Sequence, residues 1–367
     1  MLRLLKIYLL PGAVLQSVNI GGGYGTGREL VEFFTRFGMG NGFAGMWLAT
    51  VAMSIVFAAT LAVAQRFSVY DYRSFFKLLL GRGWFLFEIL GVILFVVVLA
   101  VIGAAAGRII QEEFGLPSFI GGVIMLVCVV ALNFFGRDWV TRVLASWSVL
   151  LYAVFIAYFI AVVNLDQIAE IGGKFQLSWS ADWIQGGFQY AFYNVAGIPI
   201  ILYAARAIES HGQAISAGLI GGLVAMFPAM LFHLSFAGAY PGILDQELPV
   251  YAMFADIAMP VLQGLYLLVL FGTFIETGAG NIQGFIERLD VWWRERHGAA
   301  LGRRHHAAVA ATALLLSGAL SSVGIVDLIA SGYGTLAWGY LFVYLLPLFS
   351  IGLWRLRKRP MPVPVAT

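Results

Sequence analysis

Gly21-Gly22-Gly23-Tyr24-Gly25-Thr26-Gly27 is the stretch that decides the fold of this chain. An apolar segment, Ile7 to Ile20, precedes it, and a charged and aromatic segment, Arg28 to Phe37, follows it. Five glycines in seven residues indicate that one membrane-crossing helix is interrupted here rather than ended. Because lipid offers no hydrogen-bond partners, unwound backbone at this depth must face protein or a water-filled cavity. The stretch therefore predicts a broken helix beside a cavity.

The composition indicates an integral membrane protein without a sizeable soluble domain. Of the 367 residues, 61% are hydrophobic and 11% are charged, and the mean hydropathy is +0.88. Soluble domains hold about 45–50% apolar residues, and a spanning helix needs about 20 of them in a row. We therefore expect an all-α membrane protein with ten transmembrane helices, at about 4–37 (broken), 41–67, 83–110, 117–136, 139–164, 181–209, 211–239, 258–290, 303–325 and 326–356.

The basic residues predict the orientation of these helices. Ten spans put both termini on one side, and that side receives all but four of the 22 lysines and arginines, the exceptions being Arg28, Arg36, Arg108 and Lys174. By the positive-inside rule, we expect cytoplasmic N- and C-termini in the inner (cytoplasmic) membrane of a bacterium. The N-terminal segment lacks a small-residue cleavage site, so we expect no signal peptide. One transmembrane domain, 1–356, would precede a cytoplasmic tail, 357–367.

A second break is predicted in the sixth helix. The run Asn194-Val195-Ala196-Gly197-Ile198-Pro199 places a glycine and a helix-breaking proline in the middle of the membrane. Gly197 follows Gly23 after about half the chain, and an odd number of crossings separates the two segments, so they cross in opposite directions. This pattern is typical of a five-plus-five inverted repeat, with halves at about 1–165 and 175–356.

The chain offers no recognisable site for catalysis. Cys128 is the single cysteine, which excludes an internal disulfide and a cysteine metal site. We find no nucleophile beside a base, no clustered metal ligands and no phosphate-binding loop. We therefore expect a protein that is not an enzyme, with no cofactor, no bound metal and no nucleic-acid partner. The lipid bilayer and a small-molecule solute are the expected partners, and the oligomeric state stays open.

The order of these features resembles the LeuT fold of the amino acid, polyamine and organocation (APC) transporter superfamily. The runs Gly-Gly-Gly-Tyr-Gly-Thr-Gly-Arg-Glu at 21–29 and Asn-Val-Ala-Gly-Ile-Pro at 194–199 further resemble the small bacterial YkvI-like membrane proteins. The architectural resemblance covers nearly the whole chain. It implies a secondary active transporter: a symporter, coupled to sodium or protons, for a small organic solute such as an amino acid or related amine, working by alternating access.

The solute is expected between the two breaks. Gly25, Thr26 and Gly27 would open the second half of helix 1, so that their amides could hold a substrate carboxylate. Tyrosines near both breaks would cover the rest of the solute. The alternatives are glycines that only allow a kink and aromatic rings that only fill the core. The expected solute-binding residues are Gly22, Gly23, Tyr24, Gly25, Thr26, Gly27, Tyr190, Tyr193, Asn194 and Gly197.

Glu276 is the expected coupling residue, because an ionisable group deep in a membrane helix is a functional candidate. Thr273, Glu276 and Thr277 repeat the spacing by which helix 8 of sodium-coupled relatives forms an ion site against helix 1, where Ile20 and Gly23 would contribute. Those relatives usually have a hydroxyl or small residue where Glu276 stands. The coupling ion, sodium or a proton, therefore stays open. The alternative for Glu276 is a salt bridge to Arg142.

Glu29, Glu32 and Arg36 follow the first break and, with Arg28, are expected to form an ion-pair cluster or external gate. The alternative for these residues is a direct contact with the substrate. Two other functions were weighed. Metal-ion transporters of this fold place Asp-Pro-Gly-Asn in helix 1 and a methionine in the helix 6 break, and neither is present here. A membrane receptor that senses a ligand without transporting it stays an alternative.

Overall fold

The computed structural model describes residues 2–134, 137–162, 175–257, 259–298 and 301–357, and the regular structure in these ranges is helical throughout. Five of the described helical segments are long and apolar enough to cross a membrane: Met39–Phe67, Tyr72–Phe114, His211–Ser235, Pro260–Arg294 and Ile325–Arg357. Shorter apolar helices lie at Ser118–Ala131, Leu150–Val162 and Ala308–Ser321. The chain is thus a helical multi-pass membrane protein, and the count of ten spans stays a prediction.

The first expected helix is broken within the glycine stretch. Its pieces are α1 (Leu2–Leu4), η1 (Leu5–Leu9), α2 (Leu10–Asn19), α3 (Gly22–Thr26), α4 (Arg28–Phe33) and η2 (Thr35–Phe37). Ile20 and Gly21 leave helical geometry, with ψ of 80° and −168°. A second change of direction follows at Gly27, whose φ is +82° and whose missing side chain makes room for Phe236 and Val250. Only glycine adopts this conformation readily in such a tight place.

The sixth expected helix is broken as well, into α11 (Ala181–Asn194), α12 (Gly197–Ile200) and η4 (Leu202–Ala205). Gly197 sits directly against α2, because a Cβ on this residue would stand 3.3 Å from Leu15 and 3.2 Å from Val18. The two breaks predicted from glycine and proline are therefore present, and they face each other.

The remaining described helices surround these two elements. They are α5 (Met39–Phe67), α6 (Tyr72–Leu80), η3 (Gly81–Trp84), α7 (Phe85–Phe114), α8 (Ser118–Phe134), α9 (Arg137–Val162), α13 (His211–Ser235), η5 (Gly242–Asp245), α14 (Pro249–Ile257), α15 (Pro260–His297), α16 (Arg303–Ser321), α17 (Ile325–Asp327), η6 (Leu328–Tyr333), α18 (Gly334–Tyr340), η7 (Leu341–Leu345), η8 (Leu348–Gly352) and α19 (Leu353–Arg357).

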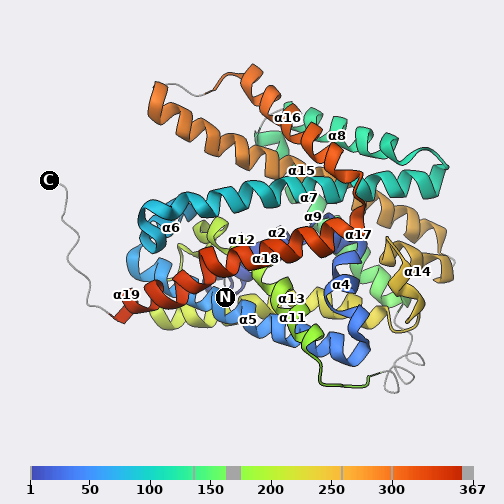
Figure 1. Cartoon of the computed structure of the whole chain (residues 1–367), viewed down its shortest axis with the longest axis horizontal. Helices are drawn as coiled ribbons and strands as arrows, with labels where there is room; N and C mark the ends of the chain where they lie inside the picture. Colours follow the sequence, from blue (N-terminus) through green and yellow to red (C-terminus); the bar gives the residue numbers. More distant parts are fainter. Residues whose placement is uncertain (1, 135–136, 163–174, 258, 299–300, 358–367) are drawn as a thin grey trace.

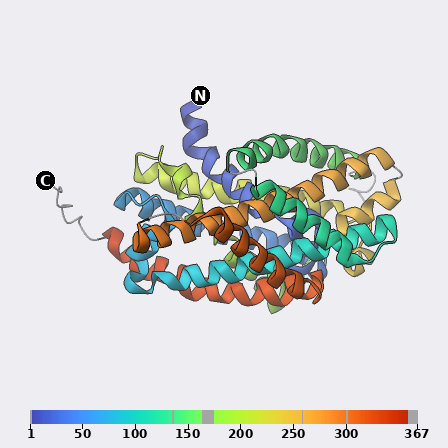
Figure 2. The same cartoon turned by 90° about the horizontal axis from the view of Figure 1, so that it is seen from above.

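Figure 1 shows two groups of helices: α8, α15 and α16 lie on one side of α7, and α5, α11 and α13 lie together on the opposite side of the molecule. The short helices α6 and α14 follow α5 and α13, at equivalent places in the two expected halves. The start of the chain projects from this body in the perpendicular view (Figure 2), where Leu4, Leu5 and Leu9 are exposed. The expected boundary between the repeats and nearly all of the tail 357–367 lie outside the described residues.

Small residues hold α5 and α13 close together. A Cβ on Gly218 would collide with the backbone of Ala58, and a Cβ on Gly222 would collide with Ser54. The Ser54 hydroxyl uses this closeness to donate a 3.0 Å hydrogen bond to the carbonyl of Leu219. In lipid, where no hydrophobic effect drives helices together, such close packing supplies the attraction between them.

We expect Gly218→Ala to destabilise the protein by about 1–3 kcal/mol, because the added methyl group meets backbone that cannot move aside. The measurement is the thermal unfolding temperature of the detergent-solubilised protein. Gly212→Ala, in the same helix, is the matched control, since its Cβ would meet no atom within 4 Å. Equal unfolding temperatures for the two variants would contradict the close α5–α13 contact.

Candidate functional site

A cavity of about 410 Å³ lies between the two breaks and is bounded further by α7, α9, α15 and the C-terminal helices η6 and α18. It brings together eight of the residues expected to bind solute or ion, or to form the gate: Ile20, Glu29, Tyr193, Asn194, Gly197, Thr273, Glu276 and Thr277. The cavity that the glycine stretch predicted is thus present beside the break.

Glu29 lies at one end of this cavity and is 4% exposed. Its Oε2 accepts a 2.6 Å hydrogen bond from the hydroxyl of Tyr193 in α11, and its carboxylate also accepts the backbone N–H of Tyr24. A Cβ on Gly23 would collide with Oε1 of Glu29. Glycine at position 23 therefore lets the Glu29 carboxylate approach the break, and this side chain links the two broken helices.

Tyr193 stacks on Tyr333, with ring centroids 4.8 Å apart, and both rings line the cavity. Tyr333 was missing from the expected site. A signal for it exists in the sequence, because Gly332-Tyr333-Gly334-Thr335 repeats the Gly-Tyr-Gly-Thr of the first break. The structure places this second copy where π-helical η6 meets α18, against α11.

Glu276 also lines the cavity, from α15, and is partly buried. No hydrogen bond or ion pair joins it to another described side chain, and it interacts electrostatically with the hydroxyl of Tyr152 in α9. The side chain of Arg142, its alternative partner, lies outside the described residues. Arg142 precedes Tyr152 by ten residues in the same helix, which corresponds to about 15 Å along the axis. Tyr152, rather than Arg142, thus lies level with Glu276.

The two threonines expected beside Glu276 lie against the first break. The Thr273 hydroxyl donates a 2.8 Å hydrogen bond to the carbonyl of Val269. The Thr277 methyl group lies close to Gly21, since a Cβ on this glycine would be 3.9 Å from it. Helix α15 therefore faces helix 1 at the height where the resemblance implies an ion site. That these residues bind an ion stays a prediction.

The glycine stretch itself differs from the expected arrangement. Helix α3 begins at Gly22, so Gly25 and Gly27 already donate their amides to the carbonyls of Gly21 (2.8 Å) and Tyr24 (2.9 Å). Thr26 is buried, donates to the carbonyl of Gly23 at 2.9 Å and accepts the amide of Arg28, the first residue of α4, at 3.3 Å. The amides of Gly25 and Gly27, which were expected to hold a substrate carboxylate, therefore already donate to backbone carbonyls.

Two of the three expected tyrosines also point away from the cavity. Tyr24 packs edge-to-face on Phe232 of α13, with centroids 6.0 Å apart. Tyr190 packs on Phe34, with centroids 4.8 Å apart, and both are fully buried. The cavity lining includes neither ring. Core packing, the alternative weighed for these aromatic residues, describes their positions.

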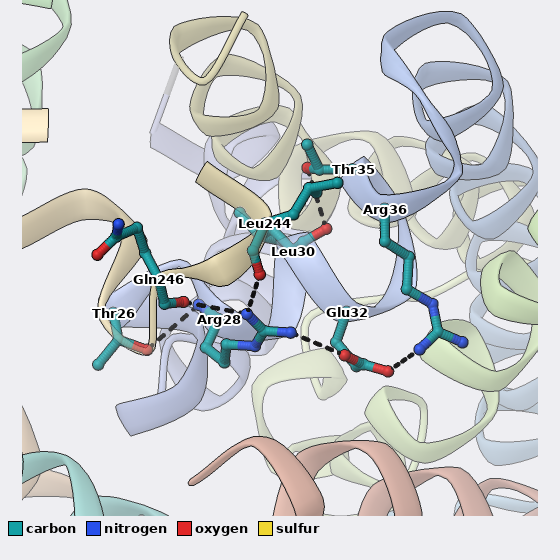
Figure 3. A network of polar contacts seen from close by, with 8 residues as sticks. All are labelled: Thr26, Arg28, Leu30, Glu32, Thr35, Arg36, Leu244 and Gln246. Carbon is teal, nitrogen blue, oxygen red and sulfur yellow. Dashed lines mark hydrogen bonds and ion pairs between the residues drawn. The ribbon is translucent and has the colours of Figure 1, made fainter. Parts of the chain in front are cut away.

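The expected ion-pair cluster forms, but without Glu29 (Figure 3). Arg28 Nη2 donates a 3.0 Å hydrogen bond to Oε2 of Glu32, and Arg36 donates one to Oε1 of the same carboxylate. Arg28 Nη1 also donates to the carbonyls of Leu244 (2.9 Å) and Gln246 (3.0 Å), which ties α4 to the segment before α14. In this cluster beyond the first break, Arg28 and Glu32 are buried. A gating role for it stays a prediction.

We expect Glu32→Ala to destabilise the protein by about 3–5 kcal/mol, because it leaves the buried Arg28 guanidinium without its carboxylate. The side chains of Arg28 and Glu32 are only 8% and 6% exposed, whereas that of Arg36 is 49% exposed. Arg36→Ala is therefore the control, with an expected cost of about 0–1 kcal/mol. Thermal unfolding in detergent measures both. A larger loss for Arg36→Ala than for Glu32→Ala would contradict the geometry.

The opposite end of the cavity reaches Arg288, twelve residues after Glu276 in α15 and hence about 18 Å away along the helix. Arg288 is 24% exposed, pairs with Glu88 at 3.4 Å and lies over the ring of Tyr72 at 4.6 Å. Because Arg288 is partly exposed while Glu29 and Tyr333 are buried, we take the Arg288 end as the open end of the cavity and the Glu29 end as the closed one.

No protein-family model matches the sequence. The chain is 25% identical over 276 residues, 72% of this chain and 76% of the relative, to the uncharacterized membrane protein YkvI of Bacillus subtilis strain 168. Its structure is similar to that of a Na+-coupled sialic acid symporter, with a TM-score of 0.64, 14% identity and coverage of 93% of this chain and 78% of the other.

Two further solved structures are similar. MhsT in complex with L-phenylalanine has a TM-score of 0.58, 15% identity and 96% coverage of both chains. The manganese transporter of Eremococcus coleocola has a TM-score of 0.54, 15% identity and coverage of 94% and 78%. At these identities the structural likeness establishes the fold. The chain is therefore a membrane protein homologous to YkvI that has the fold of the LeuT-type transporters.

Proposed function

We propose that this protein is a secondary active transporter: a cation-coupled symporter that moves a small organic solute by alternating access. The observation that carries the proposal is the cavity between two broken helices, with the carboxylates of Glu29 and Glu276 inside it. Similar structures include a Na+-coupled symporter and a protein that binds L-phenylalanine. We place it in the bacterial inner membrane with both termini cytoplasmic, on the distribution of lysines and arginines.

The arrangement supports alternating access in a simple way. The cavity is open at one end, while the Tyr193–Tyr333 stack and the Arg28–Glu32–Arg36 cluster lie toward the other. Opening the second end requires the two half-helices of each broken helix to move relative to α7 and α15. The breaks provide places where backbone angles can change without disturbing a continuous helix.

Ion coupling is assigned to α15. The carboxylate of Glu276 either ligates sodium, with the Thr273 and Thr277 hydroxyls and helix 1 carbonyl groups such as that of Ile20, or carries a proton. Both readings let the ion and the solute share one cavity, so that occupancy of one site changes the affinity of the other.

A solute panel tested on the purified protein examines this proposal. A ligand that binds only the folded state at 100 times its Kd adds about 2.7 kcal/mol of stability. We expect at least one small organic solute to raise the unfolding temperature, and sodium or a change of pH to alter the effect. If the rise in unfolding temperature caused by the solute is the same at all sodium concentrations and pH values, the result contradicts a cation-coupled symporter and favours a ligand-sensing receptor.

A further inference from the structure

We propose that the solute is an organic cation, an amine without a carboxylate, whose ammonium group binds to Glu29 at the closed end of the cavity. The proposal rests on the transporter function above and names the substrate class of that cavity. In place of backbone amides that hold a substrate carboxylate, the proposed site is a carboxylate that holds a substrate cation.

Glu29 has hydrogen-bond partners but no counter-charge among the residues that the structure describes. Its described partners are the hydroxyl of Tyr193 and the amide of Tyr24, both uncharged donors. The adjacent Arg28 directs its guanidinium to Glu32 and to backbone carbonyls instead. A buried carboxylate without an opposite charge is costly, and either a proton or a cation bound beside it removes this cost.

The rest of the cavity offers little to an anion. Among the described lining residues the charged side chains are Glu29, Glu276 and Arg288. Arg288 is engaged by Glu88 and by the ring of Tyr72, and it lies at the open end. Near the first break, the amides of Gly25 and Gly27 are bonded to carbonyls and that of Tyr24 to Glu29. The carboxylate of an amino acid would therefore lie near the acidic Glu29 and Glu276, with no unengaged cationic side chain among the described lining residues.

The surroundings of Glu29 also suit an ammonium group with an apolar tail. The stacked rings of Tyr193 and Tyr333 line the cavity beside the carboxylate and exclude water from it, and aromatic rings contact ammonium groups favourably. Beyond them the lining is mainly apolar, with Leu94, Val98 and Leu151 among its members. A compact amine can thus place its charge at the closed end and its hydrocarbon along the wall.

Matched sets of three compounds test the charge requirement directly. Each set keeps one hydrocarbon side chain and carries an amine only, both ionic groups, or a carboxylate only. Phenethylamine, phenylalanine and 3-phenylpropanoate form one set, and isoamylamine, leucine and 4-methylpentanoate form a second. Binding is read from thermal stabilisation and isothermal titration of the full-length protein in detergent. We expect the amine of at least one set to bind at least about tenfold more tightly than its two partners, a difference of about 1.4 kcal/mol.

Three variants show whether Glu29 is the receptor. Glu29→Gln should weaken amine binding at least about tenfold, because the amide keeps the shape and removes the charge. Glu29→Asp, which keeps the charge, should retain the preference for the amine. Asp182→Asn is the matched control and should bind the amine as the unchanged protein does, since Asp182 lies on an exposed part of α11 outside the cavity.

The inference is overturned if the amino acid or the carboxylic acid binds better than the amine, if no amine of either set binds, or if Glu29→Gln binds the amine unchanged. The comparison within each set uses the unmodified protein, so it decides the question even where a variant does not fold. Transport is a separate result: an amine that binds through Glu29 but never enters proteoliposomes upholds the substrate class and refutes the transporter.

Discussion

Replacing Glu276 by glutamine is expected to abolish the dependence of solute binding and uptake on sodium or pH while the protein still folds. Glutamine keeps the shape of the side chain, but it carries no charge for sodium and releases no proton at neutral pH. No ion pair joins Glu276 to another described side chain, so its loss should leave the described packing unchanged. The ratio of solute affinities with and without the coupling ion should fall from about tenfold or more to about one.

Titration of solute binding at several sodium concentrations and pH values measures this ratio. Glu287→Gln is a suitable control, because it makes the same chemical change in the same helix, at a residue outside the cavity lining. Unaltered sodium and pH dependence in Glu276→Gln would assign this residue a structural role and remove it from the coupling site.

Gly23→Ala is expected to reduce solute binding by at least about tenfold through displacement of Glu29, although residue 23 itself lies outside the cavity lining. The added methyl group would occupy the place of the Glu29 Oε1 and push the carboxylate away from Tyr193. Gly21→Ala provides the steric comparison, because its Cβ would meet only the Thr277 methyl group, at an ordinary 3.9 Å.

Isothermal titration of both variants and the unmodified protein checks this effect. If Gly23→Ala binds the same solute with unchanged affinity, the position of Glu29 against the break does not determine binding. A structure of Gly23→Ala with Glu29 still bonded to Tyr193 would contradict the steric argument in the same way.

Local composition was sufficient to predict both breaks. Glycine at 21–27 and the Gly197–Pro199 pair weaken the helix wherever they are placed, so no knowledge of the neighbouring helices was needed. The inward position of Glu276 was equally accessible, because a carboxyl group at that depth cannot face lipid. Such predictions depend on the residue and its depth alone.

The directions of the side chains after the first break could not be predicted from the sequence in this way. Helix α3 has only five residues and ends at a left-handed Gly27, so helical spacing does not carry over from α3 to α4. Tyr24 consequently packs on α13. The i, i+4 pattern correctly joined Glu32 to Arg36, and the structure adds Arg28 to the same carboxylate. The pattern could not indicate that Glu29 folds back across Gly27 to the amide of Tyr24.

Tyr333 was missed for a different reason. The inverted repeat pairs the tenth helix with the fifth, so repeat symmetry gives no reason to place the second Gly-Tyr-Gly-Thr near the first break. The contact between Tyr193 and Tyr333 depends on how α11 packs against η6 and α18, which is tertiary information. A repeated motif of this kind, four residues long and placed near a predicted cavity, is worth testing as a site even when repeat symmetry does not pair it.

Uptake into proteoliposomes is the direct test of secondary active transport by this protein. Purified protein is reconstituted and given a labelled solute identified by the binding panel, under an inward gradient of sodium or of protons, with ionophore-treated vesicles and Glu276→Gln as controls. We predict that one of the two gradients drives accumulation of the solute above its external concentration. This accumulation should collapse with the ionophore and be absent in Glu276→Gln. A solute that binds the purified protein but is never accumulated under either gradient would contradict secondary active transport and leave a ligand-binding membrane receptor.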